Sequence, residues 1–173
     1  MYSKMMVANE IEAPFYYLKD TSKTPINRQT NSAKDTNDFQ TTRDPAIMKI
    51  KNGRLLATNP TLDREGFAFS KQTSKVVNFF DDSELDTIYS SEIEDLIKSV
   101  SGGTEAVVFD HTRRSTAPQQ REKYNARDPV PAPHSDYSDK SAKQRMHDVF
   151  GEQIGDKLNR RFAMVNAWRS MTE

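Results

Sequence analysis

Several apolar segments of this chain have the length of a strand, and polar stretches separate them. Residues 66–80, "GFAFSKQTSKVVNFF", alternate and predict two short strands joined by a polar turn. Residues 105–111, "EAVVFDH", predict a core strand, and residues 160–170, "RRFAMVNAWRS", predict another. Residues 6–18 and 134–138 are further candidate strands.

Two other regions have helical patterns. In residues 81–103, Asp81 or Asp82 can cap the start, and Gly102 with Gly103 can end the helix. One buried face is predicted from the spacing of Ile93, Leu96, Ile97 and Val100, and Ser91 with Glu94 could restart the helix as a capping box. Residues 139–160 form a second helical region, broken at Gly151 or Gly155. Strands and helices mix without regular βαβ alternation, so we predict an α+β fold.

Composition narrows the class of protein. The 173 residues are about one domain, and 25 basic residues balance 25 acidic ones, so nucleic acid and anionic membranes are not expected partners. There is no cysteine, which excludes disulfides and thiolate sites. No stretch approaches the ~18 apolar residues of a membrane span, and the start lacks a secretory signal. We therefore expect a single soluble, cytoplasmic domain over 1–173, with a long or mobile polar loop at 19–44.

The segment "PVPAPHSDYS" places a histidine and an aspartate one residue apart, at His134 and Asp136. Alternate residues of a strand project to the same side, so the two side chains should lie close together. Imidazole and carboxylate donors suit a borderline divalent metal, and a distant second histidine would complete a 2-His-1-carboxylate triad. The alternative is a loop histidine that pairs with an aspartate at the surface.

Four segments in order strengthen the metal interpretation: "LDREGFAFSKQTSKVVNFFDD", "AVVFDHTRRS", "PVPAPHSDYS" and "RRFAMVNAWR". Together they resemble the gibberellin-desaturase/CmcJ-like family of Fe(II)/2-oxoglutarate-dependent oxygenases. The resemblance implies a double-stranded β-helix (a cupin-like jelly roll) with flanking helices, which would hydroxylate or desaturate a small organic molecule. It also implies Fe(II) as cofactor, 2-oxoglutarate and molecular oxygen as cosubstrates, and His134 and Asp136 as the first two metal ligands.

The resemblance suggests roles for further residues. Asn166, Trp168 and Arg169 would line the pocket near the cosubstrate, although Asn166 could also be a structural amide with a buried partner. His111 could be a third ligand, could hydrogen-bond to a ligand, or could hold the fold, and we favour the last two. Arg113, grouped with His111 as a possible neighbour of the ligands, could meet an anionic substrate or be solvated.

The sequence also departs from the family pattern. In the family, the strand matching 160–170 is followed by a segment with the second iron histidine and the arginine for 2-oxoglutarate. Neither has a match here, and about five or six candidate strands fall short of the ~8 of a jelly roll. We therefore expect an incomplete barrel lacking its C-terminal part, which a second chain or another copy would complete through exposed strand edges. The competing interpretation is a non-catalytic accessory or binding protein.

Overall fold

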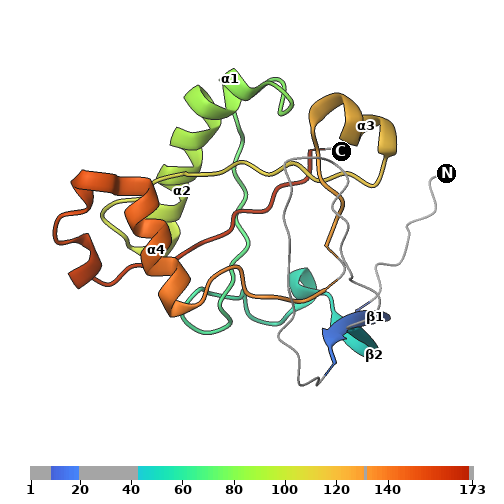
Figure 1. Cartoon of the computed structure of the whole chain (residues 1–173). Helices are drawn as coiled ribbons and strands as arrows, with labels where there is room; N and C mark the ends of the chain where they lie inside the picture. Colours follow the sequence, from blue (N-terminus) through green and yellow to red (C-terminus); the bar gives the residue numbers. More distant parts are fainter. Residues whose placement is uncertain (1–8, 20–42, 131, 172–173) are drawn as a thin grey trace. The chain divides into compact units, whose positions relative to one another are not determined.

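The structure, a computed structural model, describes residues 9–19, 43–130 and 132–171 (Figure 1). The chain divides into two compact units, one comprising residues 1–70 and 112–133 and the other residues 71–111 and 134–173. Most of the loop predicted at 19–44 lies outside the described residues.

The first unit contains a two-stranded antiparallel sheet of β1 (Glu10–Leu18) and β2 (Arg43–Lys51), shown side by side in Figure 1. The register pairs Glu10 with Lys51 and Leu18 with Arg43. β1 confirms the strand predicted within 6–18, whereas β2 was not predicted. Each strand contains a proline, which a two-stranded sheet tolerates because every strand has an unpaired edge.

Residues 112–133, interpreted as a loop, contain the short helix α3 (Pro118–Tyr124). Pro118 suits the first turn because it lacks the N–H that would have no partner there. A 3-10 turn, η1 (Gly53–Leu55), also lies in this unit, and the side chain of Asn52 caps it.

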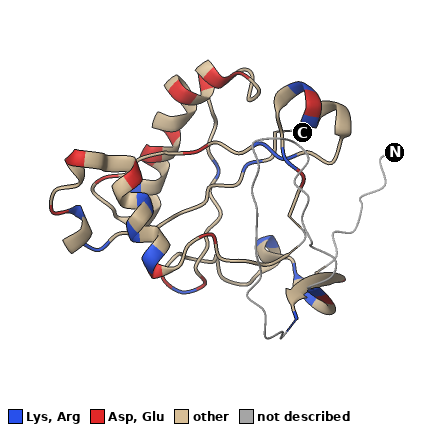
Figure 2. Cartoon of the chain, viewed as in Figure 1, with Lys and Arg blue, Asp and Glu red and all other residues tan. Residues whose placement is uncertain are grey.

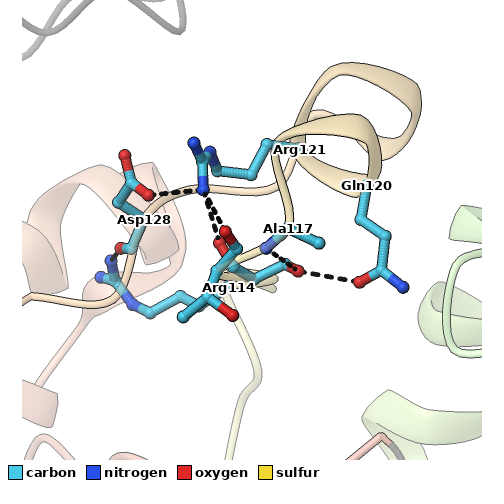
Figure 3. A network of polar contacts seen from close by, with 7 residues as sticks. Arg114, Ala117, Gln120, Arg121 and Asp128 are labelled. Atoms are coloured by element: carbon cyan, nitrogen blue, oxygen red, sulfur yellow. Dashed lines mark hydrogen bonds and ion pairs between the residues drawn. The ribbon is translucent and has the colours of Figure 1, made fainter.

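Arg121 closes the loop around α3 (Figure 3). Its Nη1 donates to the carbonyls of Ser115 and Thr116 at 3.2 and 3.0 Å and lies 2.7 Å from Oδ1 of Asp128. Arg114 donates to the Asp128 carbonyl at 2.8 Å. Only 24% of the Arg121 side chain is exposed, so we interpret this arginine as a residue that stabilises the loop.

The second unit begins with a nearly continuous helical stretch: α1 (Asp82–Glu84), the π-helical turn η2 (Leu85–Tyr89) and α2 (Ser90–Ser101). This confirms the helix predicted in 81–103. Asp81 caps its start by accepting from the N–H groups of Ser83 and Glu84, and Gly102 ends it with φ of 70°. Because the chain stays helical through Ser90, the expected restart at Ser91 does not occur, and Glu94 instead accepts from the Val108 N–H at 3.0 Å.

The second predicted helical region, 139–160, is also confirmed. It consists of α4 (Asp139–Phe150) and the 3-10 turns η3 (Gly151–Ile154) and η4 (Lys157–Asn159). Gly151 ends α4 with φ of 49°, a conformation that glycine adopts without steric cost.

The strands predicted at 66–80, 105–111, 134–138 and 160–170 are not assigned as strands in the described part of the chain. A strand-like sequence forms a strand only when a neighbouring segment supplies a hydrogen-bonding ladder, and these segments run without one. The jelly-roll architecture therefore remains a prediction.

Few apolar side chains of the second unit are deeply buried. Leu85 is 4% exposed and Val76 is 8% exposed. On the predicted inner face of α2, Leu96 and Ile97 are half-buried, but Val100 is 39% exposed and the expectation for it was wrong. Val100 lies in the last turn of α2, next to the exposed Ser101 and Gly102.

Glu92 ties α2 to the segment before it. Its carboxylate accepts from the Ser74 hydroxyl at 2.5 Å and from the Lys75 N–H at 2.7 Å, and its carbonyl accepts from Gln72. The Ser74 hydrogen bond is the main cause of the lowered pKa of Glu92, while burial acts in the opposite direction.

Candidate metal-binding site

His134 and Asp136 meet directly in the second unit. The imidazole Nε2 lies 3.1 Å from carboxylate Oδ1, and the side chains are 47% and 42% exposed. The two donor atoms are thus adjacent, as the one-residue spacing predicts, although the segment is not in a strand ladder.

The pair is held from its C-terminal side by the start of α4. Ser138 caps this helix, and a reciprocal capping box joins Ser138 and Ser141 through both side chains and both backbone N–H groups. The ring of Tyr137 packs edge-on against Phe109 at 6.4 Å, and its hydroxyl accepts from Arg145 at 3.3 Å. Neither of these interactions was predicted, although "SDKS", one residue after the HxD pattern, is recognisable as a helix start.

Asn166 joins the pair from the distant 160–170 segment. Its Nδ2 donates to Oδ2 of Asp136 at 2.6 Å. Three of the predicted site residues, from two segments, therefore lie together. The carboxylate has one oxygen facing His134 and the other facing Asn166.

Trp168 and Arg169 follow Asn166 in the same segment, and Arg169 contacts aromatic side chains, whereas Asn166 contacts Asp136. Trp168 is 79% exposed. The guanidinium of Arg169 lies 5.1 Å from the ring centroid of Phe79, and this ring packs edge-on against Tyr89 at 5.2 Å. Burial raises the pKa of Tyr89, and the charge of Arg169 partly offsets that rise. Arg169 thus belongs to an aromatic cluster.

His111 is held by Ser90 at the junction of η2 and α2. Its Nε2 lies 2.9 Å from Ser90 Oγ, which itself donates to the Leu85 carbonyl at 3.0 Å. Which of the two groups donates in this contact depends on the tautomer of the His111 ring. No sequence pattern indicates this contact with Ser90.

His111 is one of the residues that line a hollow of about 430 Å³. The lining also includes the apolar residues Leu85 and Phe109 and the acidic residues Asp82, Asp86 and Asp110. Figure 2 shows acidic residues in red along the helical stretch from α1 to α2.

Arg113 lies in the first unit, where its Nη1 donates to the Tyr124 carbonyl at 3.4 Å. Like Arg121, it supports the loop around α3.

The spacing of the HxD pair is compatible with two adjacent metal ligands and equally with the surface ion pair that was the alternative. Two donors at adjacent corners of an octahedron, each about 2.1 Å from the metal, are about 3.0 Å apart. The Nε2 to Oδ1 separation of 3.1 Å is close to that spacing. Within residues 9–19, 43–130 and 132–171, no three or more His, Cys, Asp or Glu side chains gather so as to hold a metal ion. The pair thus offers two donors for a metal.

A family model described as an oxidoreductase/YMDC permease-like domain matches residues 15–173. The chain belongs to this family. The predicted resemblance to oxidoreductases is confirmed at this level. No helix in the described part of the chain is both long and apolar enough to cross a membrane.

Curated relatives of this oxidoreductase/YMDC permease-like chain are fungal enzymes. An alpha-ketoglutarate-dependent dioxygenase from a fungal species is 25% identical over 80% of the chain and 52% of its own length. An oxidoreductase of Emericella nidulans is 25% identical over 72% of the chain and 44% of its own length. A hydroxylase/desaturase of Cercospora beticola is 29% identical over 70% of the chain and 41% of its own length. The chain spans about half the length of these relatives, and no solved structure matches it.

Proposed function

We propose that this chain is part of an Fe(II)/2-oxoglutarate-dependent oxygenase of the gibberellin-desaturase/CmcJ-like type, with a double-stranded β-helix architecture. The reaction would be the hydroxylation or desaturation of a small organic molecule with molecular oxygen. The observation that carries the proposal is the contact of His134 with Asp136, with their donor atoms 3.1 Å apart. The name of the fungal alpha-ketoglutarate-dependent dioxygenase supports the choice of 2-oxoglutarate and molecular oxygen as cosubstrates.

In this proposal, His134 binds the metal through Nε2 and Asp136 binds it through a carboxylate oxygen. Bound iron would supply the oxidising chemistry, which no side chain of this chain can supply by itself. The protein's own contribution is to hold the two donors at the spacing of adjacent ligands and to fix the carboxylate through Asn166. Because a facial triad needs three ligands, a further donor must come from outside this pair.

Metal titration of the purified chain tests the proposal. Anaerobic Fe(II), or Mn(II) as a surrogate, should bind weakly to the wild type, and His134→Ala or Asp136→Ala should abolish that binding. His147→Ala is the matched control, because His147 is an exposed histidine within α4. We expect oxygen-dependent decarboxylation of 2-oxoglutarate by this chain to be absent or marginal, because two donors do not complete the triad.

Metal binding that does not depend on His134 would contradict the proposal and favour the accessory, non-catalytic function. Tight one-to-one binding that is lost in His134→Ala and also in His111→Ala, together with robust turnover, would show instead that His111 completes the site.

A further inference from the structure

We propose that Asn166 is a positioning residue that fixes Asp136 so that the carboxylate presents only Oδ1 to a metal. The inference rests on the proposed function, and it assigns Asn166 to the ligand carboxylate instead of to the cosubstrate.

The division of the carboxylate between two partners carries this inference. Oδ1 lies 3.1 Å from Nε2 of His134, and Oδ2 accepts a short 2.6 Å hydrogen bond from Nδ2 of Asn166. An ionised carboxylate only accepts hydrogen bonds, so the Asn166 amide must present its NH₂ group to it. The orientation of the amide follows from this pairing.

Two residues shortly before Asn166 are partly shielded from solvent. Phe162 and Met164 are both half-buried, whereas Asn166 itself is exposed. An exposed amide hydrogen bond competes with water, so the persistence of the contact with Asp136 is the quantity that the first part of the test measures.

The consequence concerns the number of positions that remain open on the metal. Carboxylates bind metals through one oxygen or through both. With Oδ2 engaged by Asn166, Asp136 would hold a metal through Oδ1 alone, and His134 would hold it through Nε2. Release of Oδ2 would allow both oxygens to bind and would remove one open position from use by cosubstrate or oxygen.

The first part of the test needs no metal. In proton–nitrogen correlation spectra, the side-chain NH₂ of Asn166 should show a downfield proton and slowed exchange with water. Asp136→Ala should return both to the values of a solvated amide, and His134→Ala should not. An Asn166 amide that is unaffected by Asp136→Ala would overturn the inference.

The second part measures Mn(II) binding and the number of water molecules on bound Mn(II) by electron paramagnetic resonance and water-proton relaxation. Asn166→Ala should weaken Mn(II) binding about 10-fold to 100-fold, as for other residues that orient metal ligands, and should reduce the bound waters by one. The double variant Asp136→Ala/Asn166→Ala should bind no Mn(II), as expected for Asp136→Ala alone. Asn159→Ala, at an exposed asparagine of η4, is the matched control and should leave binding unchanged.

The outcomes separate the two proposals. If Asn166→Ala binds Mn(II) with wild-type affinity and water count, the positioning role is wrong while the metal pair stands. If wild-type binding does not depend on His134 and Asp136, both proposals fail. An effect of Asn166→Ala on 2-oxoglutarate affinity alone would overturn the positioning role in favour of cosubstrate contact.

Discussion

Replacing Glu92 should destabilise the second unit in a pH-dependent way. The carboxylate accepts from Ser74 Oγ at 2.5 Å and from the Lys75 N–H at 2.7 Å, which connects α2 to a segment with no strand partner. Hydrogen bonds to charged groups contribute about 1.5–3 kcal/mol each when well shielded from water. Since the Lys75 end is exposed, we expect Glu92→Ala to lower the free energy of unfolding by about 2 kcal/mol in total.

The pH dependence follows from the lowered pKa of Glu92, which the Ser74 hydrogen bond causes above all. A carboxyl whose pKa is lower in the folded state stabilises the fold above its unfolded pKa, about 4.3 for glutamate. This contribution disappears as the pH falls through the folded pKa. The difference in the free energy of unfolding between wild type and Glu92→Gln should therefore be largest near neutral pH and should shrink toward pH ~3.

Urea unfolding followed by far-UV circular dichroism, at pH ~7 and pH ~3, measures both effects. Glu152→Gln, at an exposed carboxylate in η3, is the control and should change stability little at either pH. A Glu92→Gln difference that is equal at the two pH values would refute the role of the ionised carboxylate. A Glu92→Ala change smaller than about 0.5 kcal/mol would show that the hydrogen bonds contribute no net stability.

Three further substitutions test other features. Leu85→Ala should lower the free energy of urea unfolding by about 2–5 kcal/mol, because truncating this 4%-exposed side chain leaves a cavity. A change within error would mean that the surrounding side chains fill the cavity. Gly102→Ala should cost about 1 kcal/mol by thermal unfolding, since φ of 70° strains any residue with a Cβ, and an unchanged melting temperature would contradict that cause. Arg121→Lys should speed proteolysis of the α3 loop, because one ammonium group cannot reproduce contacts to two carbonyls and Asp128, and cleavage at the wild-type rate would argue against the stabilising role of Arg121.

The helices were predictable because their signals are local. Asp81 at the start and Gly102 at the end of the 81–103 region are capping residues whose effect does not depend on the rest of the chain. The π-helical turn was not predictable, because it differs from an α-helix by one residue and leaves no compositional mark. The strands predicted at 105–111 and 160–170 depend on non-local partners, and pattern alone cannot say whether a partner is present.

The candidate site also contains contacts that the sequence pattern predicts and contacts that it does not predict. The proximity of His134 and Asp136 follows from their spacing, whereas the contact of Asn166 with Asp136 joins segments far apart in sequence. Sequence pattern could mark Asn166 as unusual among apolar neighbours but could not name its partner. Arg169 shows the limit most clearly, since its position against Phe79 depends on how two distant segments pack.

The π-helical turn η2 constrains the number of residues in this part of the chain more strongly than it constrains which residues they are. Each residue added to or removed from a helix rotates all that follows by about 100°. Ser90 donates to the Leu85 carbonyl through its backbone N–H and its hydroxyl. Its side chain contacts His111 only when the helix has this rotation about its axis. Deleting one residue of η2 would restore regular α-helical winding and turn Ser90 away from His111. Among related sequences, substitutions inside this turn should therefore be tolerated far more often than single-residue deletions, which an alignment of homologues can check.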